Sequence, residues 1–229
     1  AQTLEALHPA FVRWPGGCIV EGIDLSNRIE WKKTIGDPKN RPGIYDTWGY
    51  RATMGFGYHE FLQFCEDIGA AGMFVCNAGI GCQGRVGDAC REEDLDAFIQ
   101  DALDAIDYAL GDGTTEWSRK RVENGHPEPF PLQYVEIGNE NWGPIYEKRY
   151  DRFYRAIKAK YPRLTLISTL GLGGQHRHER VDMIDPHWYV APEFFLSSSR
   201  LFDQQERGGY AVYVGEYAVN QQVGGGNLL

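Results

Sequence analysis

Two glutamates follow apolar runs in the sequence and stand beside aromatic residues, a setting that suits carboxyl catalysis. Glu140 comes in a turn after the run 133–137, and Glu216 comes directly after the run 211–215. Two carboxyl groups about 5–5.5 Å apart can cleave a glycosidic bond with retention of configuration. One donates a proton to the leaving oxygen, and the other attacks the anomeric carbon. We therefore expect Glu140 to act as acid/base and Glu216 as nucleophile, although either residue alone could equally belong to a surface turn.

Polar and aromatic side chains near these glutamates are candidates for holding a sugar. Asn139 is expected to hydrogen-bond a sugar hydroxyl while its neighbour Glu140 protonates the adjacent bond, and Trp142 flanks the same turn. His187 and Tyr189 alternate along one apolar run, so both side chains are expected to reach the same pocket. The alternative for His187 is a histidine whose hydrogen bonds are satisfied within the core.

The chain alternates short apolar runs with amphipathic segments. Runs rich in Val, Ile, Phe and Tyr predict strands buried on both faces, at Phe11–Trp14, 73–77, 133–137, 164–168, 183–187 and 211–215. Apolar residues at helical spacing predict helices, at 59–69, 92–110 and 148–161. This alternation is typical of βαβ units and a parallel sheet. Two inserts without periodicity, 22–57 and 114–131, are expected to be irregular loops that wall a functional face.

Polar residues follow the predicted strands one after another: Asn77, Asn139, Glu140, His187, Tyr189 and Glu216. Asn77 is expected at the edge of the site. Barrel enzymes place their chemistry at the carboxyl ends of their strands. A doubly wound nucleotide-binding sheet would need a G-x-G-x-x-G turn, and residues 171–174 lack that spacing. The sequence therefore favours an α/β fold of the (β/α)8 TIM-barrel type.

Composition restricts the partners of the protein. The 229-residue chain has a formal net charge of −9, which argues against a nucleic-acid partner because phosphate binding needs clustered Lys and Arg. No apolar run approaches the roughly 20 residues that span a bilayer, and the N-terminus shows no leader pattern. We therefore expect neither a nucleic-acid nor a membrane partner.

Cysteine usage shows no sign of a disulfide framework or a metal centre. The chain has 5 cysteines, an odd number, and no C-x-x-C pair. We expect buried or partly buried thiols. The run His176-Arg177-His178-Glu179 contains ligand-type residues, but it lies in a loop-like, glycine-flanked segment. The sequence predicts no metal and no cofactor.

Several motifs are similar to those of glycoside hydrolase family 51, the α-L-arabinofuranosidases. The segment 13–22, RWPGGCIVEG, resembles the R-[FYW]-P-G-G-x-x-V-x-G loop of that family. The resemblance continues along nearly the whole chain, in Trp48-Gly49-Tyr50, Gly125-His126-Pro127-Glu128-Pro129-Phe130, Gly138-Asn139-Glu140 and Gly215-Glu216-Tyr217-Ala218. It implies a (β/α)8 barrel and a retaining mechanism, with the acid/base after the fourth strand and the nucleophile after the seventh.

The resemblance also has implications for the sugar contacts and the extent of the chain. Many family members have an arabinose-contacting Asn where this chain has Cys18, so Cys18 is expected to line the site. The first strand of the family would precede Ala1 and the eighth would follow Leu229, since residues 224–228 resemble the segment before it. Residues 1–229 are thus expected to be one catalytic barrel domain, truncated at both ends and incomplete, with strands two to seven. The family further implies an extracellular or periplasmic location and allows a homo-oligomer of the full-length parent.

These observations together predict a retaining hydrolase that releases terminal α-L-arabinofuranosyl residues from arabinan or arabinoxylan. One alternative is another retaining glycosidase of the same barrel clan, acting on xylan or β-glucan. A second alternative is an inactive sugar-binding module. The presence of both Glu140 and Glu216, each with an aromatic neighbour, speaks against the inactive module.

Overall fold

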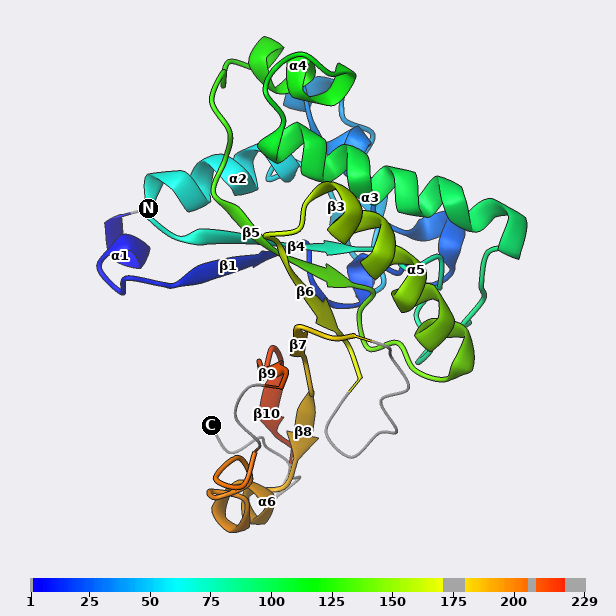
Figure 1. The fold of residues 1–229 in the computed structure, drawn as a ribbon, viewed down its shortest axis with the longest axis vertical. Coiled ribbons are helices and arrows are strands. Elements are labelled where there is room, and N and C mark those ends of the chain that lie inside the picture. Colours follow the sequence, from blue (N-terminus) through cyan, green and yellow to red (C-terminus); the bar gives the residue numbers. More distant parts are fainter. Residues whose placement is uncertain (1, 171–179, 206–208, 221–229) are drawn as a thin grey trace.

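The computed structural model describes residues 2–170, 180–205 and 209–220. Six parallel strands form one curved sheet (Figure 1) in the order β1-β4-β5-β6-β7-β9. Their bounds are Phe11–Trp14, Ala71–Cys76, Leu132–Ile137, Thr165–Ser168, Met183–Ile184 and Ala211–Val212. Each falls on a predicted strand, because a strand covered on both faces keeps a continuous apolar run that the sequence shows directly.

Three long helices cover the outer face of the sheet, at the positions that periodicity predicted (Figure 1). They are α2 (Tyr58–Asp67), α3 (Leu95–Leu110) and α5 (Pro144–Lys160). The main core lies between these helices and the strands. Trp14 on β1 stacks against Phe61 of α2, with ring centroids 5.7 Å apart. Two short helices, α1 (Gln2–Glu5) and α6 (Pro192–Ser197), lie outside this layer.

The inner face of the sheet carries a different set of side chains. Phe11 meets the rings of Tyr134 and Tyr213, with centroids 5.9 and 5.3 Å apart. Two residues further along the strands, Arg13 pairs with Glu136. This layering of inward side chains is that of a barrel interior. The polar layer lies on the side of the carboxyl ends of the strands, where the site is expected.

The sheet is an open half-barrel. Within the described residues, β1 pairs only with β4 and β9 pairs only with β7, so the first and last strands each have a free edge. The prediction of an incomplete barrel with six strands is confirmed. Edges of this kind offer unpaired backbone groups to other chains.

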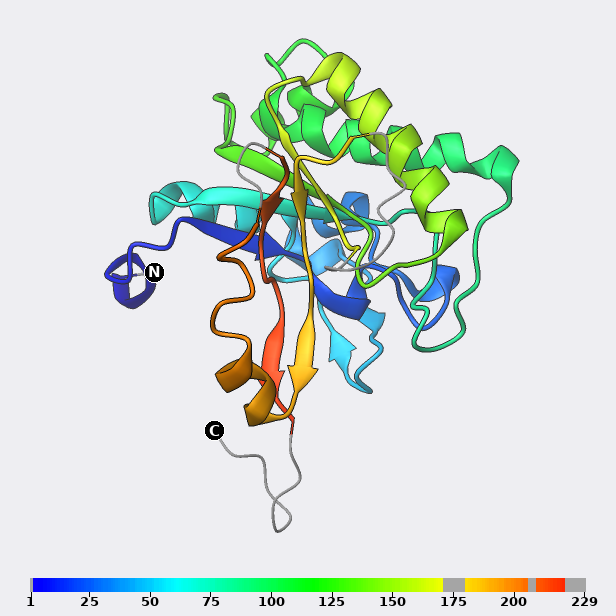
Figure 2. The same cartoon turned by 60° about the horizontal axis from the view of Figure 1, so that its bottom comes forward.

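The last two strands of the sheet are interrupted and then continue as a second parallel pair. β8 (Trp188–Val190) follows β7, and β10 (Tyr217–Val219) follows β9 (Figure 2). Between the two ladders the chain advances four residues from Ile184 to Trp188, but five from Val212 to Tyr217. The extra residue makes a β-bulge, a feature that re-aims side chains and is frequent next to active sites. The regular strands are therefore shorter than the predicted runs 183–187 and 211–215.

The insert 114–131 corrects one expectation, because it contains the helix α4 (Glu116–Glu123) rather than only irregular loop. The helix shows no apolar period because the side chains that it buries are Ser118 and Arg121. Arg121 donates to backbone carbonyls in the last turn of α3 and in the neighbouring loops, which satisfies its buried guanidinium. The other insert, 22–57, has short 3-10 turns and the hairpin β2 (Ile44–Tyr45) and β3 (Arg51–Ala52).

Some features singled out in the sequence lie outside the described residues: the glycine-rich segment 171–174, the His176-x-His178-Glu179 run and the segment 224–228. Among the helices of the described segments, none is long and apolar enough to cross a membrane.

Candidate active site

Arg13 on β1 forms the floor of the site. Its guanidinium donates to both carboxylate oxygens of the fully buried Glu136, at 2.7 and 3.2 Å, and to Oδ1 of Asn139 at 2.8 Å. The remaining nitrogen, Nη1, donates to Oε1 of Glu216 at 2.9 Å. Gly16 has φ +66, and a Cβ there would lie 2.8 Å from Arg13 Nη1, so the turn after β1 needs glycine at this position.

Glu216 is held at both carboxylate oxygens. Arg13 donates to Oε1, and the hydroxyl of Tyr189 donates to Oε2 at 2.5 Å. Burial raises the pKa of the Tyr189 hydroxyl and the adjacent Glu216 carboxylate raises it further, so Tyr189 keeps the proton that it donates. A guanidinium and a phenol aimed at the two oxygens suit the charged carboxylate that a nucleophile needs.

Glu140 faces Glu216 across the mouth of the half-barrel. One carboxylate oxygen of each lies within 4.8 Å of the other and of a ring nitrogen of His187. This proximity fits the about 5–5.5 Å separation of carboxyl groups in retaining glycosidases. Glu140 also has φ +45, in the left-handed region that non-glycine residues rarely adopt. Backbone strain of this kind concentrates at functional sites.

His187 lies between two carboxylates. Its Nδ1 is 2.9 Å from Oε1 of Glu140, and its Nε2 is 3.0 Å from Oδ2 of the buried Asp185. Burial by itself lowers the pKa of His187, but the hydrogen bonds to Asp185 and Glu140 outweigh it and raise the pKa to about 10. The imidazole is therefore protonated at neutral pH and donates from both nitrogens.

The buried carboxyl group of Glu21 holds the side chains of Asn139 and Asn141 through hydrogen bonds. Asn139 Nδ2 donates to one oxygen of Glu21 at 3.1 Å, and Asn141 Nδ2 donates to the other at 2.7 Å. Burial raises the pKa of Glu21 to about 8, with the two amide hydrogen bonds opposing the rise and Glu140 adding to it. Asn139 is itself fully buried, and its Oδ1 accepts from Arg13, so its amide links Glu21 to Arg13 beneath the turn that carries Glu140.

An open cleft of about 380 Å³ borders Glu140, the acid/base candidate. Its lining includes Glu140, His187, Cys82 and Trp142. Trp142 is 53% exposed. The side chain of Gln83 holds the backbone of Trp142: its Oε1 accepts from Trp142 N at 2.8 Å, and its Nε2 donates to the carbonyl of Trp142 at 3.2 Å. An aromatic face fixed at the edge of the cleft suits contact with a sugar ring.

The structure brings most of the predicted site residues together but leaves Asn77 out of the cleft. Its side chain donates to the carbonyls of Val20 and Ile80 and accepts from the amides of Gly79 and Ile80. All of its hydrogen-bonding capacity is thereby used in shaping a loop. Cys18, in contrast, lies beside the acid/base candidate, with Sγ 3.9 Å from Oε2 of Glu140.

Sequence reasoning did not identify Arg13, Glu21, Asp185 or Glu136 as site residues. One signal was present: Asp185 stands two residues before His187, so strand alternation places both side chains on the same face. For Glu136 and Arg13 the signal was a charged residue inside an apolar strand, which requires a partner when buried. Glu21 has no comparable sign in its neighbouring residues.

A parallel half-barrel with two carboxylates facing each other beyond its strands is the arrangement that glycosidases of the TIM-barrel type have. Comparison with known proteins gives the family. The α-L-arabinofuranosidase 1 domain family matches residues 3–207. The chain belongs to this family, the α-L-arabinofuranosidases of glycoside hydrolase family 51.

Individual relatives agree with this assignment. Alpha-L-arabinofuranosidase 2 of Arabidopsis thaliana is 39% identical over 100% of this chain and 34% of its own length. The extracellular exo-alpha-L-arabinofuranosidase of Streptomyces chartreusis is 37% identical over 95% of this chain and 29% of its own length. An arabinose-bound family 51 α-L-arabinofuranosidase superimposes with a TM-score of 0.87 at 33% identity, over 95% of this chain and 35% of its own. The chain thus spans about a third of the length of these relatives.

Proposed function

We propose that this chain carries the catalytic pair of a retaining, exo-acting α-L-arabinofuranosidase, with Glu140 as acid/base and Glu216 as nucleophile. The observation that carries the proposal is the pair of carboxylate oxygens within 4.8 Å of each other at the mouth of the half-barrel. Membership of the family supports the choice of sugar, because two relatives of this chain are named α-L-arabinofuranosidases and a similar structure holds arabinose.

The first step breaks the glycosidic bond. Glu216 attacks the anomeric carbon with the electron pair of one carboxylate oxygen, while Glu140 transfers its proton to the departing glycosidic oxygen. The product is a covalent arabinosyl ester on Glu216. Arg13 and Tyr189 hold the attacking carboxylate in place, so little reorganisation is needed at the moment of attack.

The second step releases the sugar. Glu140, now ionised, takes a proton from a water molecule, and the resulting oxygen attacks the anomeric carbon from the side that the leaving group vacated. The ester bond to Glu216 breaks, and the configuration at the anomeric carbon is retained. His187, protonated and bonded to Oε1 of Glu140, orients this carboxylate in both steps.

The remaining polar and aromatic groups supply sugar contacts in this proposal. Cys18 borders the arabinose ring, Trp142 contacts the part of the polymer that leaves, and the buried Asn139 positions the turn that carries Glu140. The polymers are arabinan or arabinoxylan chains. The Streptomyces relative is named as extracellular, which supports an extracellular or periplasmic location in this proposal.

The test compares nitrophenyl glycosides of different sugars. We expect hydrolysis of the α-L-arabinofuranoside to exceed that of the β-D-xyloside and the β-D-glucoside by far, with the α-anomer of arabinose released first in a proton NMR time course. Higher activity on the xyloside or glucoside would assign a different retaining glycosidase. Binding of arabino-oligosaccharides without hydrolysis of any glycoside would instead reveal an inactive sugar-binding module.

A further inference from the structure

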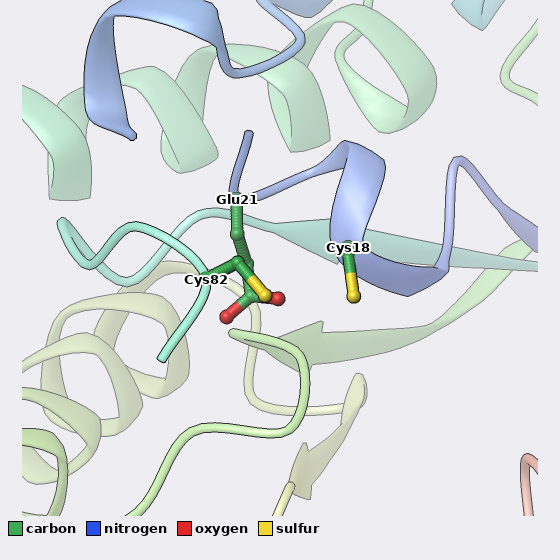
Figure 3. A group of neighbouring side chains, drawn as sticks. All are labelled: Cys18, Glu21 and Cys82. Atoms are coloured by element: carbon green, nitrogen blue, oxygen red, sulfur yellow. The ribbon is translucent and has the colours of Figure 1, made fainter. Parts of the chain in front are cut away.

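The thiols of Cys18 and Cys82 and the carboxyl group of Glu21 lie close together beside Glu140, although Cys82 is distant from the other two in the sequence. Cys18 lies in a 3-10 turn after β1, Glu21 follows that turn, and Cys82 lies in the loop after β4 (Figure 3). One donor atom from each, Sγ, Sγ and a carboxylate oxygen, lies within 4.8 Å of the others. Cys82 and Glu21 are buried, whereas Cys18 is partly exposed.

The geometry points to a binding site for a thiophilic divalent cation, such as Zn²⁺ or Cd²⁺, formed by Cys18, Cys82 and Glu21 and acting as an inhibitory site beside Glu140. Zinc takes thiolate and carboxylate ligands with bonds of about 2.3 and 2.0–2.2 Å, so two sulfurs in a tetrahedral site lie about 3.8 Å apart. Donors within 4.8 Å need to close by only about 1 Å, which side-chain rotation supplies.

The charge balance around the three donors favours a cation. In the ranges that the structure describes, Glu21 forms no ion pair, and its hydrogen bonds come from neutral groups, the amides of Asn139 and Asn141 and the thiol of Cys82. A carboxylate has further lone pairs, so the amide hydrogen bonds leave room for a metal bond. On binding, both thiols and the Glu21 carboxyl group, whose pKa burial raises to about 8, lose their protons to solvent, and the divalent ion offsets two of the three resulting negative charges.

The site is reachable and lies next to the proposed acid/base. Cys82 and Glu140 both line the open cleft, which gives a path for the ion. Oε2 of Glu140 is 3.9 Å from Sγ of Cys18, close enough to become the fourth ligand. A carboxylate bound to a metal can no longer exchange the proton that both steps need. The inhibitory consequence rests on the proposed function of Glu140, whereas the binding of the ion does not.

Cadmium gives the direct test, because a Cd²⁺–thiolate bond produces an ultraviolet charge-transfer band that reports binding without any activity. We expect one equivalent of Cd²⁺ to generate the band in the protein. C18S and C82S should each weaken Cd²⁺ affinity at least tenfold and reduce the band, and C18S alone carries the test if the buried Cys82→Ser variant fails to fold. C65S, which removes a buried thiol of α2 remote from this loop, is the matched control and should leave the titration unchanged.

A band of equal strength and affinity in C18S and C82S, or no band in the folded protein, would overturn the site.

Inhibition is measured separately. Micromolar Zn²⁺ should inhibit hydrolysis of the nitrophenyl arabinofuranoside in the unmutated protein and in C65S, with recovery on adding a chelator, and should lose at least tenfold in potency in C82S. Stoichiometric Cd²⁺ binding together with full activity would overturn the inhibitory coupling to Glu140. A protein that binds Cd²⁺ but hydrolyses no glycoside would contradict the proposed function and leave the metal site supported.

Discussion

The carboxylate of Asp185 accepts the backbone N–H of Gly215 at 2.5 Å, across the bulge that separates the two ladders of the last strands. The same carboxylate accepts from Nε2 of His187 at 3.0 Å. One buried side chain thereby fixes the backbone that precedes Glu216 and the imidazole that orients Glu140. The placement of the two carboxylates proposed to be catalytic therefore depends on a residue that hydrogen-bonds to neither of them.

Replacing Gly215 with alanine should disturb this arrangement, because a Cβ at this position collides with the Asp185 carboxylate. We expect G215A to lower the free energy of unfolding by about 1–3 kcal/mol, the usual cost of overpacking, and to reduce kcat by displacing Glu216. Urea denaturation and the rate on a nitrophenyl arabinofuranoside measure the two effects. Among the described residues, a Cβ at Gly209 would meet no atom within 4 Å, so G209A is the control that should change neither quantity. Equal behaviour of the two variants would contradict the proposed contact.

The roles of the two glutamates can be separated by adding azide to alanine variants. E140A keeps the nucleophile, so a substrate with a good leaving group should still form the glycosyl-enzyme, and azide should release it with retained configuration. Unactivated arabinosides, which need the proton, should lose about 10²–10⁴-fold in rate. E216A forms no intermediate, so azide should give the inverted product.

The configuration of the azide product is read by NMR. E193A removes an exposed glutamate of α6 and should behave like the unmutated protein. If E140A yielded the inverted azide, the two assignments would have to be exchanged.

The raised pKa of His187 makes the stability of the protein depend on pH. Its pKa is about 10 in the folded state and about 6.5 in the unfolded chain, so the folded state binds the extra proton. This contribution is complete below pH 6.5 and is lost as the pH rises through 10, with a slope of at most about 1.4 kcal/mol per pH unit.

Urea denaturation of the protein and of H187Q between pH 6 and 10 measures the dependence. The stability advantage of the unmutated protein over H187Q should shrink steadily across this window. H8Q, which removes an exposed histidine, should parallel the unmutated protein. An advantage that stays constant with pH would show that His187 is not protonated between its two carboxylates.

Arg13 serves both the fold and the site, and paired substitutions separate the two contributions. R13M leaves the Glu136 carboxylate buried without a partner, which should cost about 3–5 kcal/mol of stability. The double variant R13M/E136L removes both charges and should recover much of this loss. Its activity should stay low, because Glu216 still lacks the donor at Oε1.

Denaturation and kcat are measured for each variant. R91M changes an exposed arginine and is expected to alter stability by less than about 1 kcal/mol. Full activity in R13M/E136L would show that Arg13 acts on Glu216 only through the fold.

The sequence alone determined the strands and helices that form the half-barrel and the two carboxylates it presents. Strands buried on both faces need continuous apolar runs, and amphipathic helices need a 3.6-residue period, so both patterns are local and can be read from neighbouring residues. Glu140 and Glu216 could be selected because parallel strands bring their carboxyl ends to one edge. The helix α4 was missed for the same reason, since a buried Arg121 leaves no apolar period.

Only the tertiary structure decided which side chains support those carboxylates. Arg13 and Glu216 are 203 positions apart, and Asn139 and Glu21 are 118 apart, so no local pattern connects them. The bulge between β9 and β10 depends on the register of two strands rather than on either run alone. Asn77 shows the converse: its position after a strand suggested the cleft, but the carbonyl of Val20 and backbone groups of its own loop satisfy its side chain. Buried polar groups need hydrogen-bond partners, and tertiary packing determines which groups lie within hydrogen-bonding distance.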